Sequence, residues 1–336
     1  MNTILTKRII IKKIIILAES EYDFKYRSIF KDIKNIEVFH GTFLQLIKQM
    51  FSGASYYHIR YIKYKGLILT FPRLLFIYCI AKVSKTKIIW TCHNIYEHKI
   101  PFKLFNKFLV YFLASISYKI IVFHKDLSAY LPNKVQNKII VASFGNFKNH
   151  FKGLNKKNTV FTKEYNNWIE KNNILQLDFI YISAAKKSNL NHLINSVKNT
   201  DLKTLIIAPN IDLNTNIEVY QNIFFYNDFV SEEIDEILTK NNHAIGFIGH
   251  NNISVPTSIY MFASYRIPMI GLDYSPVNSI LTDNEIGLIT KEDDFDLVTK
   301  KIKSNYLFYQ KNLDKFLELN SWENSSFEHK KLLENE

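Results

Sequence analysis

Segment 87–98, KIIWTCHNIYEH, contains the side chains of this chain that are best suited to proton transfer. Its apolar run at 88–90 predicts a buried parallel strand that stops where polar residues begin. Ligands of open α/β sheets lie just beyond the carboxyl ends of the strands. His93 is therefore placed where an imidazole can act as a general base near neutral pH. The plainer alternative is a histidine that only satisfies a backbone carbonyl.

Other residues near predicted strand ends offer the same chemistry. Asn94 is expected to orient the turn after the strand, and His98 follows it by four residues. Glu97 is an alternative base on the same segment. Three acidic residues after the predicted first strand are also candidates, although a solvated loop explains them equally well: Glu19, Glu21 and Asp23.

A second set of residues suits a diphosphate. Pro256 fits the first turn of a helix, with Ser254 at or near its cap. A helix N-terminus offers free N–H groups and partial positive charge, and the hydroxyls of Thr257 and Ser258 add hydrogen bonds. Simple capping by Ser254 is the alternative.

Further candidates for a nucleotide lie near other strand ends. Lys186 and Lys187 could neutralise a diphosphate leaving group, or be ordinary surface lysines. Asn210, Asp228 and Phe229 follow two more predicted strands and would lie near a base or ribose.

Metal and dinucleotide sites are not expected. The chain has two cysteines, no CxxC spacing and no GxGxxG loop. The acidic run 292–296 precedes a predicted helix, which favours capping over metal binding.

Alternating strands and helices predict a doubly wound α/β fold with two tandem Rossmann-like domains and a cleft between them. The domains are expected at 1–150 and 151–336, with a polar linker near 146–158. The predicted strands of the first half are 9–18, 56–61, 87–92, 119–123 and 138–142, and its helices are 24–34, 42–51, 67–83 and 101–117. The predicted strands of the second half are 179–183, 204–208, 223–225, 244–248 and 268–272, with helices from 189, 231, 256 and 293.

The charge of the chain is divided between its halves. Residues 1–153 carry +18, whereas residues 154–336 carry −6. The basic half could face an anionic membrane surface or nucleic acid, or be a solvated surface. No nucleic-acid-binding motif is present, so nucleic acid is not an expected partner. Cysteine usage and the lack of a signal-peptide pattern predict a cytoplasmic protein.

One predicted helix supports the membrane interpretation. Apolar residues recur at spacings of three and four along 101–117, flanked by lysines, as in helices that lie in a membrane interface. Packing under the sheet is the alternative for this stripe: Phe102, Phe105, Phe108, Leu109, Phe112 and Leu113.

These features together resemble GT-B glycosyltransferases, in particular bacterial family 4-like enzymes that build surface polysaccharides. Their first domain has an apolar-W-T-x-H-N strand end followed by P-H-E, and His93, Asn94 and His98 match it. Glu97 and Lys99 replace the Pro and Glu of that pattern. The segments FIYISAAKKSNLNHLI, FYNDFVSEEIDEIL and SVPTSIYMFASYRIPMIGLD resemble the donor side, and SWE the start of a last helix that crosses back to the first domain.

The resemblance implies a metal-independent hexosyltransferase at the inner face of the plasma membrane. It would move a sugar from a nucleotide-sugar to a lipid-linked glycan for capsule or lipopolysaccharide, with the nucleotide-sugar a substrate and no cofactor. The glutamate pair of retaining members is absent, because Ile253 and Met261 occupy those positions. An inverting mechanism and a non-catalytic GT-B-like subunit therefore both stay open.

Overall fold

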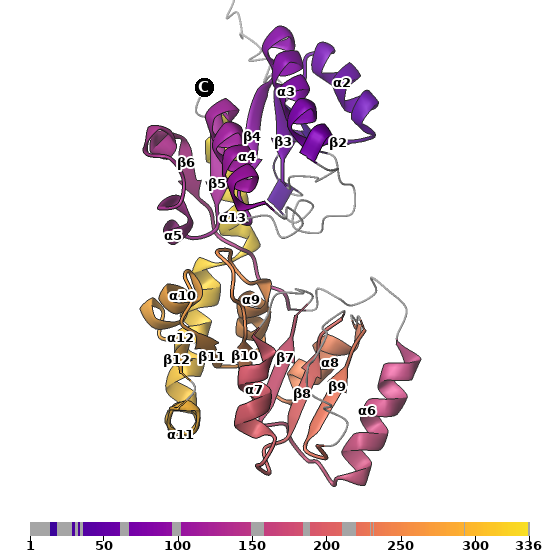
Figure 1. The fold of residues 1–336 in the computed structure, drawn as a ribbon, viewed down its shortest axis with the longest axis vertical. Coiled ribbons are helices and arrows are strands. Elements are labelled where there is room, and N and C mark those ends of the chain that lie inside the picture. Colours follow the sequence, from indigo (N-terminus) through magenta and orange to yellow (C-terminus); the bar gives the residue numbers. More distant parts are fainter. Residues whose placement is uncertain are drawn as a thin grey trace, which may run out of the picture. The chain divides into compact units, whose positions relative to one another are not determined.

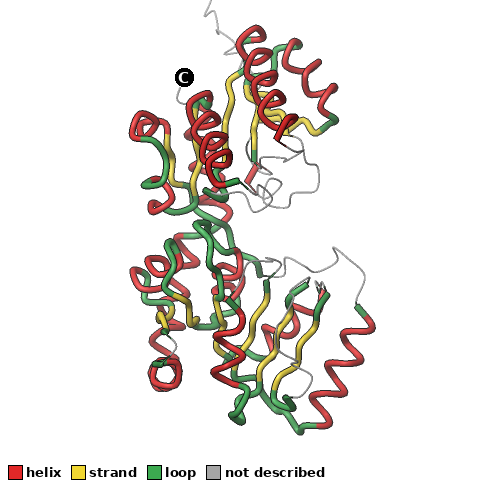
Figure 2. Tube along the Cα trace, viewed as in Figure 1, coloured by secondary structure: helices red, strands yellow, loops and turns green. Residues whose placement is uncertain are grey.

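The computed structural model describes residues 14–18, 29–30, 33, 36–60, 67–95, 102–148, 158–183, 189–209, 220–228, 230, 232–291 and 293–334. The chain forms two compact α/β units, one of residues Met1–Ala142 with Trp322–Glu336 and one of Ser143–Ser321. Each unit is built on one six-stranded parallel sheet (Figures 1 and 2). The predicted α/β class with two Rossmann-like domains is confirmed. The expected linker falls largely on 149–157, outside the described residues.

The first sheet has the strand order β2-β1-β3-β4-β5-β6. Its strands are β1 (Ile14–Ala18), β2 (Ile36–His40), β3 (Tyr56–Ile59), β4 (Lys87–Thr91), β5 (Lys119–Val122) and β6 (Ile139–Val141). The direction of winding reverses between β1 and β3, which marks the point where ligands of such sheets bind. Strand β2 was not predicted from the sequence, because this edge strand has no fully buried residue and therefore no continuous apolar run.

The helices of this unit that the structure describes in full include one 3₁₀ helix. They are α2 (Phe43–Phe51), α3 (Leu67–Ser84), α4 (Lys103–Ile116), α5 (Lys125–Ser128), the 3₁₀ turn η1 (Asn133–Lys138) and α13 (Trp322–Glu334). Thr42 begins α2 with a capping box, in which its backbone N–H donates to Gln45 Oε1 at 2.8 Å. The predicted helix 24–34 is described only at 29–30 and 33, where 29–30 are helical.

Helix α13 packs on the first unit although it follows the second in sequence. Ser326 Oγ donates to the Ile29 carbonyl at 2.5 Å. The Tyr56 hydroxyl on β3 donates to the Leu333 carbonyl at 3.4 Å. The His329 ring meets Phe30 edge-on at 5.7 Å between centroids. These contacts tie the end of the chain to its beginning.

The aromatic stripe of α4 does not as a whole face the sheet. Asn106, Leu109, Val110, Leu113 and Ala114 are the buried residues of this helix. Of the predicted stripe, Leu109 and Leu113 are among them and Phe105 and Phe112 are half-buried, so packing under the sheet is wrong only for the exposed Phe102 and Phe108. Phe108 and Phe112 each lie 5.0 Å from the Phe71 ring on α3, and Phe102 is 56% exposed. None of the described helices is long and apolar enough to span a bilayer.

The second sheet has the order β12-β11-β10-β7-β8-β9, and its winding reverses between β7 and β10. Its strands are β7 (Phe179–Ile182), β8 (Thr204–Ile207), β9 (Ile223–Tyr226), β10 (Ile245–Ile248), β11 (Met269–Leu272) and β12 (Gly287–Thr290). Every residue of β7, β8, β10 and β11 is buried, as expected of a parallel sheet covered on both faces.

The helices of this unit are α6 (Thr159–Lys171), α7 (Leu190–Val197), α8 (Glu232–Lys240), α9 (Thr257–Ser264), α10 (Val277–Asp283), α11 (Phe295–Ser304) and α12 (Tyr306–Leu319). Four of these elements were not predicted from the sequence: helices α6, α10 and α12 and strand β12. Strand β12 begins with Gly287, where a Cβ would lie 2.2 Å from the Met269 carbonyl oxygen. A four-residue strand that starts with glycine gives little apolar signal.

Candidate functional site

The carboxyl end of β4 presents the predicted catalytic segment. The Cys92 backbone N–H continues the ladder to the Ile121 carbonyl at 2.8 Å, and the Cys92 thiol lies 3.6 Å from the Asn94 carbonyl. Cys92 is fully buried. The chain turns there, and His93 is half-buried with its ring 5.2 Å from Phe123 after β5. His93 therefore lies at the sheet edge where a ligand would bind.

A second histidine lies at the same edge. His58 is in β3, and its Nε2 is 2.7 Å from the Thr91 hydroxyl oxygen on β4. Burial, together with the positive charge of Arg60 and the neighbouring His329, holds the pKa of His58 well below its ordinary value. The imidazole is therefore neutral near pH 7. His58 was not selected from the sequence, although one histidine in an otherwise apolar strand is a detectable signal.

A third histidine, His329, comes from helix α13, which packs on the first unit. His329 is 3% exposed, and its Nδ1 donates to the Ser325 carbonyl at 2.7 Å. Burial lowers the pKa of His329 to about 4, with Arg60 adding to the effect and the hydrogen bond opposing it. His58 and His329 are thus both buried and neutral near pH 7, whereas His93 is half-buried.

The carboxyl end of β10 carries the second predicted site. The Asn189 N–H, at the start of α7, donates to the Gly249 carbonyl at 2.8 Å. His250 Nε2 lies 2.6 Å from the Ser254 hydroxyl oxygen. These contacts lie beside the β7–β10 reversal, where a ligand of this unit is expected.

The prediction that Ser254 caps α9 is wrong. Pro256 is the N-cap residue and makes no side-chain capping bond, whereas the Ser254 side chain turns to His250. The reason is that Ser254 lies two residues before the N-cap position, which Pro256 occupies. Thr257 is exposed and Ser258 is half-buried, so both remain available to a ligand near the helix start.

The structure places only some of the predicted residues. Asp228 is exposed just after β9. Ser254, Thr257 and Ser258 lie close together in the second unit, and His93 and Asn94 lie together in the first. The remaining predicted residues fall outside the described part of the chain: Glu97, His98, Lys186, Lys187, Asn210 and Phe229, and likewise Glu19, Glu21 and Asp23.

The acidic run before α11 organises a turn. Asp294 Oδ1 accepts from the Lys291 N–H and from the Thr290 hydroxyl, both at 2.8 Å. These bonds lower the pKa of the Asp294 carboxyl, the backbone bond most. Among the described residues, no group of three or more His, Cys, Asp and Glu side chains is arranged to hold a metal ion.

The positions of the missing glutamates are also visible. Met261 is 5% exposed within α9, and Ile253 is half-buried in the preceding loop. The sequence holds no acidic residue between Glu236 and Asp273. An acid–base role at this segment would have to come from His250 or from hydroxyl groups.

Comparison with known proteins places the fold. No family model matches the chain, and no curated protein matches it. Anabaena Alr3699/HepE in complex with UDP and glucose is 10% identical with a TM-score of 0.63, covering 96% of this chain and 99% of that one. A glycosyltransferase from Rickettsia africae ESF-5 is 14% identical with a TM-score of 0.61, covering 97% and 99%. WaaG, a glycosyltransferase involved in lipopolysaccharide biosynthesis, is 6% identical with a TM-score of 0.55, covering 96% and 100%.

At such identities the agreement is one of fold. Both sheets of the chain are represented, because the matches cover nearly the full length of each protein. The chain therefore has the GT-B fold that was predicted.

Proposed function

We propose that this protein is a glycosyltransferase that moves a sugar from a nucleotide-sugar to a lipid-linked glycan acceptor in the synthesis of a bacterial surface polysaccharide. The observation that carries the proposal is the full-length GT-B match to HepE, a protein whose structure holds UDP and glucose. Fold alone does not specify activity, so the residues at the strand ends must support it. Both sheets present polar side chains at the edges where ligands bind.

In the proposed reaction, the first unit takes the acceptor and the second the donor. For an inverting transfer, His93 removes the acceptor hydroxyl proton as the new C–O bond forms, and Glu97 is the alternative base. For a retaining transfer, His93 instead hydrogen-bonds the donor sugar. Asn94 and His98 lie on the acceptor side.

The departing nucleoside diphosphate needs stabilisation of its charge. The N–H groups at the start of α9 and the hydroxyls of Thr257 and Ser258 suit its phosphates. Ser254 contributes to donor binding through its contact with His250. The other proposed donor contacts are Lys186, Lys187, Asn210, Asp228 and Phe229. The proposed transfer is of the hexosyltransferase type, with these side chains and N–H groups rather than a metal ion stabilising the leaving diphosphate.

The proposed location is the cytoplasmic face of the plasma membrane, with peripheral attachment. The +18 charge of residues 1–153 and the exposed apolar residues of α3 and α4 support it. Capsule and lipopolysaccharide are the surface glycans in question.

A second function is favoured by one observation. The α9 segment has a buried methionine where retaining enzymes of this resemblance carry a glutamate. A GT-B-like subunit that binds a donor or a partner without transfer would tolerate that replacement.

Thermal-shift measurements with a panel of nucleotide-sugars and nucleoside diphosphates test the donor assignment. A ligand at about 100 times its Kd stabilises the folded protein by about 2.7 kcal/mol. We expect one nucleotide series to raise the melting temperature. No shift with any of them would remove the transferase proposal, and binding without donor consumption would favour the non-catalytic subunit.

A further inference from the structure

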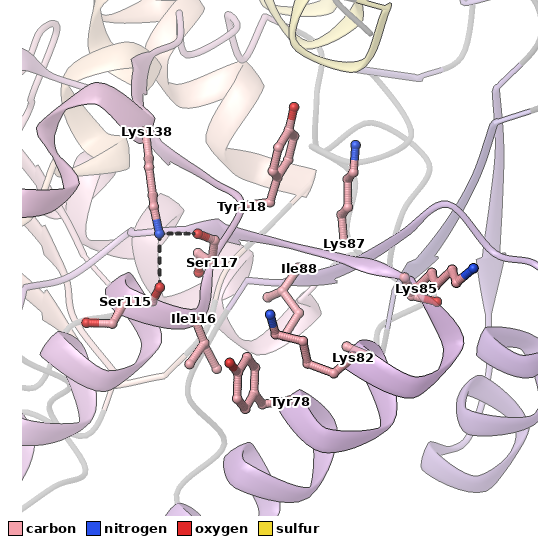
Figure 3. Close-up of a pocket in the computed structure, with 12 residues that line it drawn as sticks. Tyr78, Lys82, Lys85, Lys87, Ile88, Ser115, Ile116, Ser117, Tyr118 and Lys138 are labelled. Atoms are coloured by element: carbon pink, nitrogen blue, oxygen red, sulfur yellow. Dashed lines mark hydrogen bonds between the residues drawn. The ribbon is translucent and has the colours of Figure 1, made fainter.

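A pocket of about 360 Å³ opens at the amino-terminal edge of the first sheet, opposite the edge that carries His93 (Figure 3). It lies where β4 and β5 begin and where α3 and α4 end. Its polar lining is formed mainly by six side chains: Tyr78, Lys82, Lys85, Lys87, Tyr118 and Lys138.

The pocket is strongly basic. Four lysines contribute to its wall, and none of its lining residues, all of which are described, is acidic. Lys87 Nζ lies 4.5 Å from the centre of the Tyr118 ring, and Lys82 Nζ lies 5.6 Å from that of Tyr78. Such cation–π contacts orient an ammonium group without neutralising its charge. The pocket is therefore suited to an anion.

One of the lysines has a structural task. Lys138 Nζ donates to the carbonyls of Ser115 and Ser117 at 2.9 and 2.8 Å, at the end of α4. Burial, with nearby Lys134, lowers the pKa of Lys138. Lys138 thus satisfies the helix end, and the positive charge that it brings also faces the pocket (Figure 3).

The other pocket lysines are not all needed to satisfy carbonyl groups at the ends of the helices. At the end of α3, the Ser84 hydroxyl donates to the Ile80 carbonyl at 2.9 Å. Lys85 and Lys87 lie beyond that helix, in the turn and at the start of β4. Lys85 has a left-handed backbone with φ of 60°, which holds its side chain at the pocket rim. Helix capping therefore does not account for Lys82, Lys85 and Lys87 together.

The two helices that end at the pocket also carry exposed apolar side chains. The two helices pack side by side through the 5.0 Å contact of Phe71 with Phe108. The exposed large apolar side chains of the two helices are Leu69, Leu75, Phe76 and Val83 on α3 and Leu104, Phe108 and Tyr111 on α4, with exposures from 38% to 85%. A basic pocket at the end of two helices with exposed apolar side chains matches a molecule with an anionic head and an apolar tail.

We propose that the pocket binds the phosphate group of an anionic phospholipid, with the acyl chains against the exposed surface of α3 and α4. The inference deepens the membrane attachment proposed above by naming a site for it, and it is independent of sugar transfer. The ammonium groups of Lys82, Lys85 and Lys87 supply the charge, and the pocket tyrosines supply hydroxyl donors.

The test uses the full chain and a double variant, Lys82→Gln with Lys85→Asn. Asparagine is chosen because it tolerates the left-handed backbone of position 85. The matched control, Lys163→Gln with Lys171→Gln, removes the same charge from exposed positions of α6 in the second unit. Flotation with phosphatidylglycerol vesicles is compared with phosphatidylcholine vesicles. In parallel, sn-glycerol 3-phosphate and inorganic phosphate are titrated while the backbone amide signals of Ser117, Tyr118 and Lys119 are followed by NMR.

We expect the pocket variant to lose at least fivefold in binding to phosphatidylglycerol vesicles, with the control unchanged. Wild-type protein should show saturable shifts at the pocket amides with glycerol phosphate, and the variant should not. If phosphate shifts the amides but vesicle binding is the same in variant and wild type, the lipid source is wrong and a soluble phosphate is the ligand. If neither measurement responds to the variant while vesicles still bind, the pocket is overturned and membrane attachment stands. If wild-type protein does not float, attachment and the lipid source both fail, whereas the donor assignment is untouched.

Discussion

Each α/β unit pairs a histidine with a hydroxyl group next to the point where the winding of its sheet reverses. In the first unit, His58 meets Thr91 at 2.7 Å, and in the second, His250 meets Ser254 at 2.6 Å. The bonds are alike, but their surroundings differ. His58 is 4% exposed and is covered by α13, whereas His250 is half-buried in a loop after β10.

Both side chains of the His58–Thr91 pair are buried, so we assign this pair a structural role. In the His250–Ser254 pair, His250 is only half-buried, so a ligand can reach it. His58 lies among Arg60 and His329, and burial keeps both histidines neutral. The His58–Thr91 bond joins β3 to β4 at the sheet edge where His93 lies. The His250–Ser254 pair is placed next to the free N–H groups of α9, where it can shape a phosphate site.

The largest expected effect concerns His93, which is half-buried at the carboxyl edge of the first sheet. His93→Ala should lower turnover by about 100-fold or more, because general base catalysis contributes roughly that much. Donor dissociation constants should stay within about twofold, measured by calorimetry. His243→Ala, at an exposed histidine between α8 and β10, is the control and should leave turnover unchanged. Equal turnover in both variants would exclude His93 as the base.

The two buried histidines, His58 and His329, should make the first unit sensitive to acid. The pKa of His329 is about 4 when folded and ordinarily 6.5, so below pH 6.5 the unfolded chain binds a proton that the folded chain does not. Stability therefore falls as the pH drops from 6.5 toward 4, by about 3 kcal/mol for this histidine. His58, shifted in the same direction, adds to the loss.

Urea unfolding followed by tryptophan fluorescence from pH 7.5 to 4.5 measures this loss, since Trp90 lies buried in β4. In His329→Gln, part of the pH dependence should disappear. If the free energy of unfolding of His329→Gln falls with pH as steeply as that of the wild type, the assignment of acid sensitivity to His58 and His329 is contradicted.

Thr91→Val tests whether the first pair is structural. Valine keeps the shape of threonine but removes the partner of His58, and an unsatisfied buried group costs about 1–3 kcal/mol. We expect that loss in the free energy of unfolding, with donor affinity unchanged. A change in donor affinity without loss of stability would contradict the structural role.

Ser254→Ala should give the smallest effect on stability and the opposite pattern. It removes the hydroxyl that meets His250, so we expect donor affinity to fall by about fivefold, as one lost hydrogen bond of about 1 kcal/mol implies. The free energy of unfolding should change by about 1 kcal/mol, because Ser254 is buried but its partner His250 is half-buried and keeps access to water. If only stability responds, the pair does not belong to the donor site.

The sequence pattern was sufficient for the central strands and for edge strands β6 and β9, but not for edge strands β2 and β12. The apolar runs of β4, β7 and β10 are buried on both faces and predict strands directly. Edge strand β2 is only partly buried, so no such run marks it.

The candidate site shows the same limit. His93 follows a recognisable strand, so its position could be predicted. The His58–Thr91 bond joins residues 33 positions apart, and the cover by α13 comes from a helix more than two hundred residues beyond β3 in the sequence. Such contacts depend on tertiary packing, which the local pattern does not contain. Tertiary packing also decides the orientation of the Ser254 side chain. The sequence shows that His250 is nearby, but not that the Ser254 hydroxyl turns to it.

The central claim is sugar transfer, and the most direct measurement follows donor and product together. Purified protein is incubated with the nucleotide-sugar that gives the thermal shift and with lipid-linked acceptors extracted from bacterial membranes, and products are identified by NMR. We predict that nucleoside diphosphate is released in equal amount to a new glycosidic linkage, and that His93→Ala prevents both. Donor that binds but is never consumed with any acceptor would contradict the account.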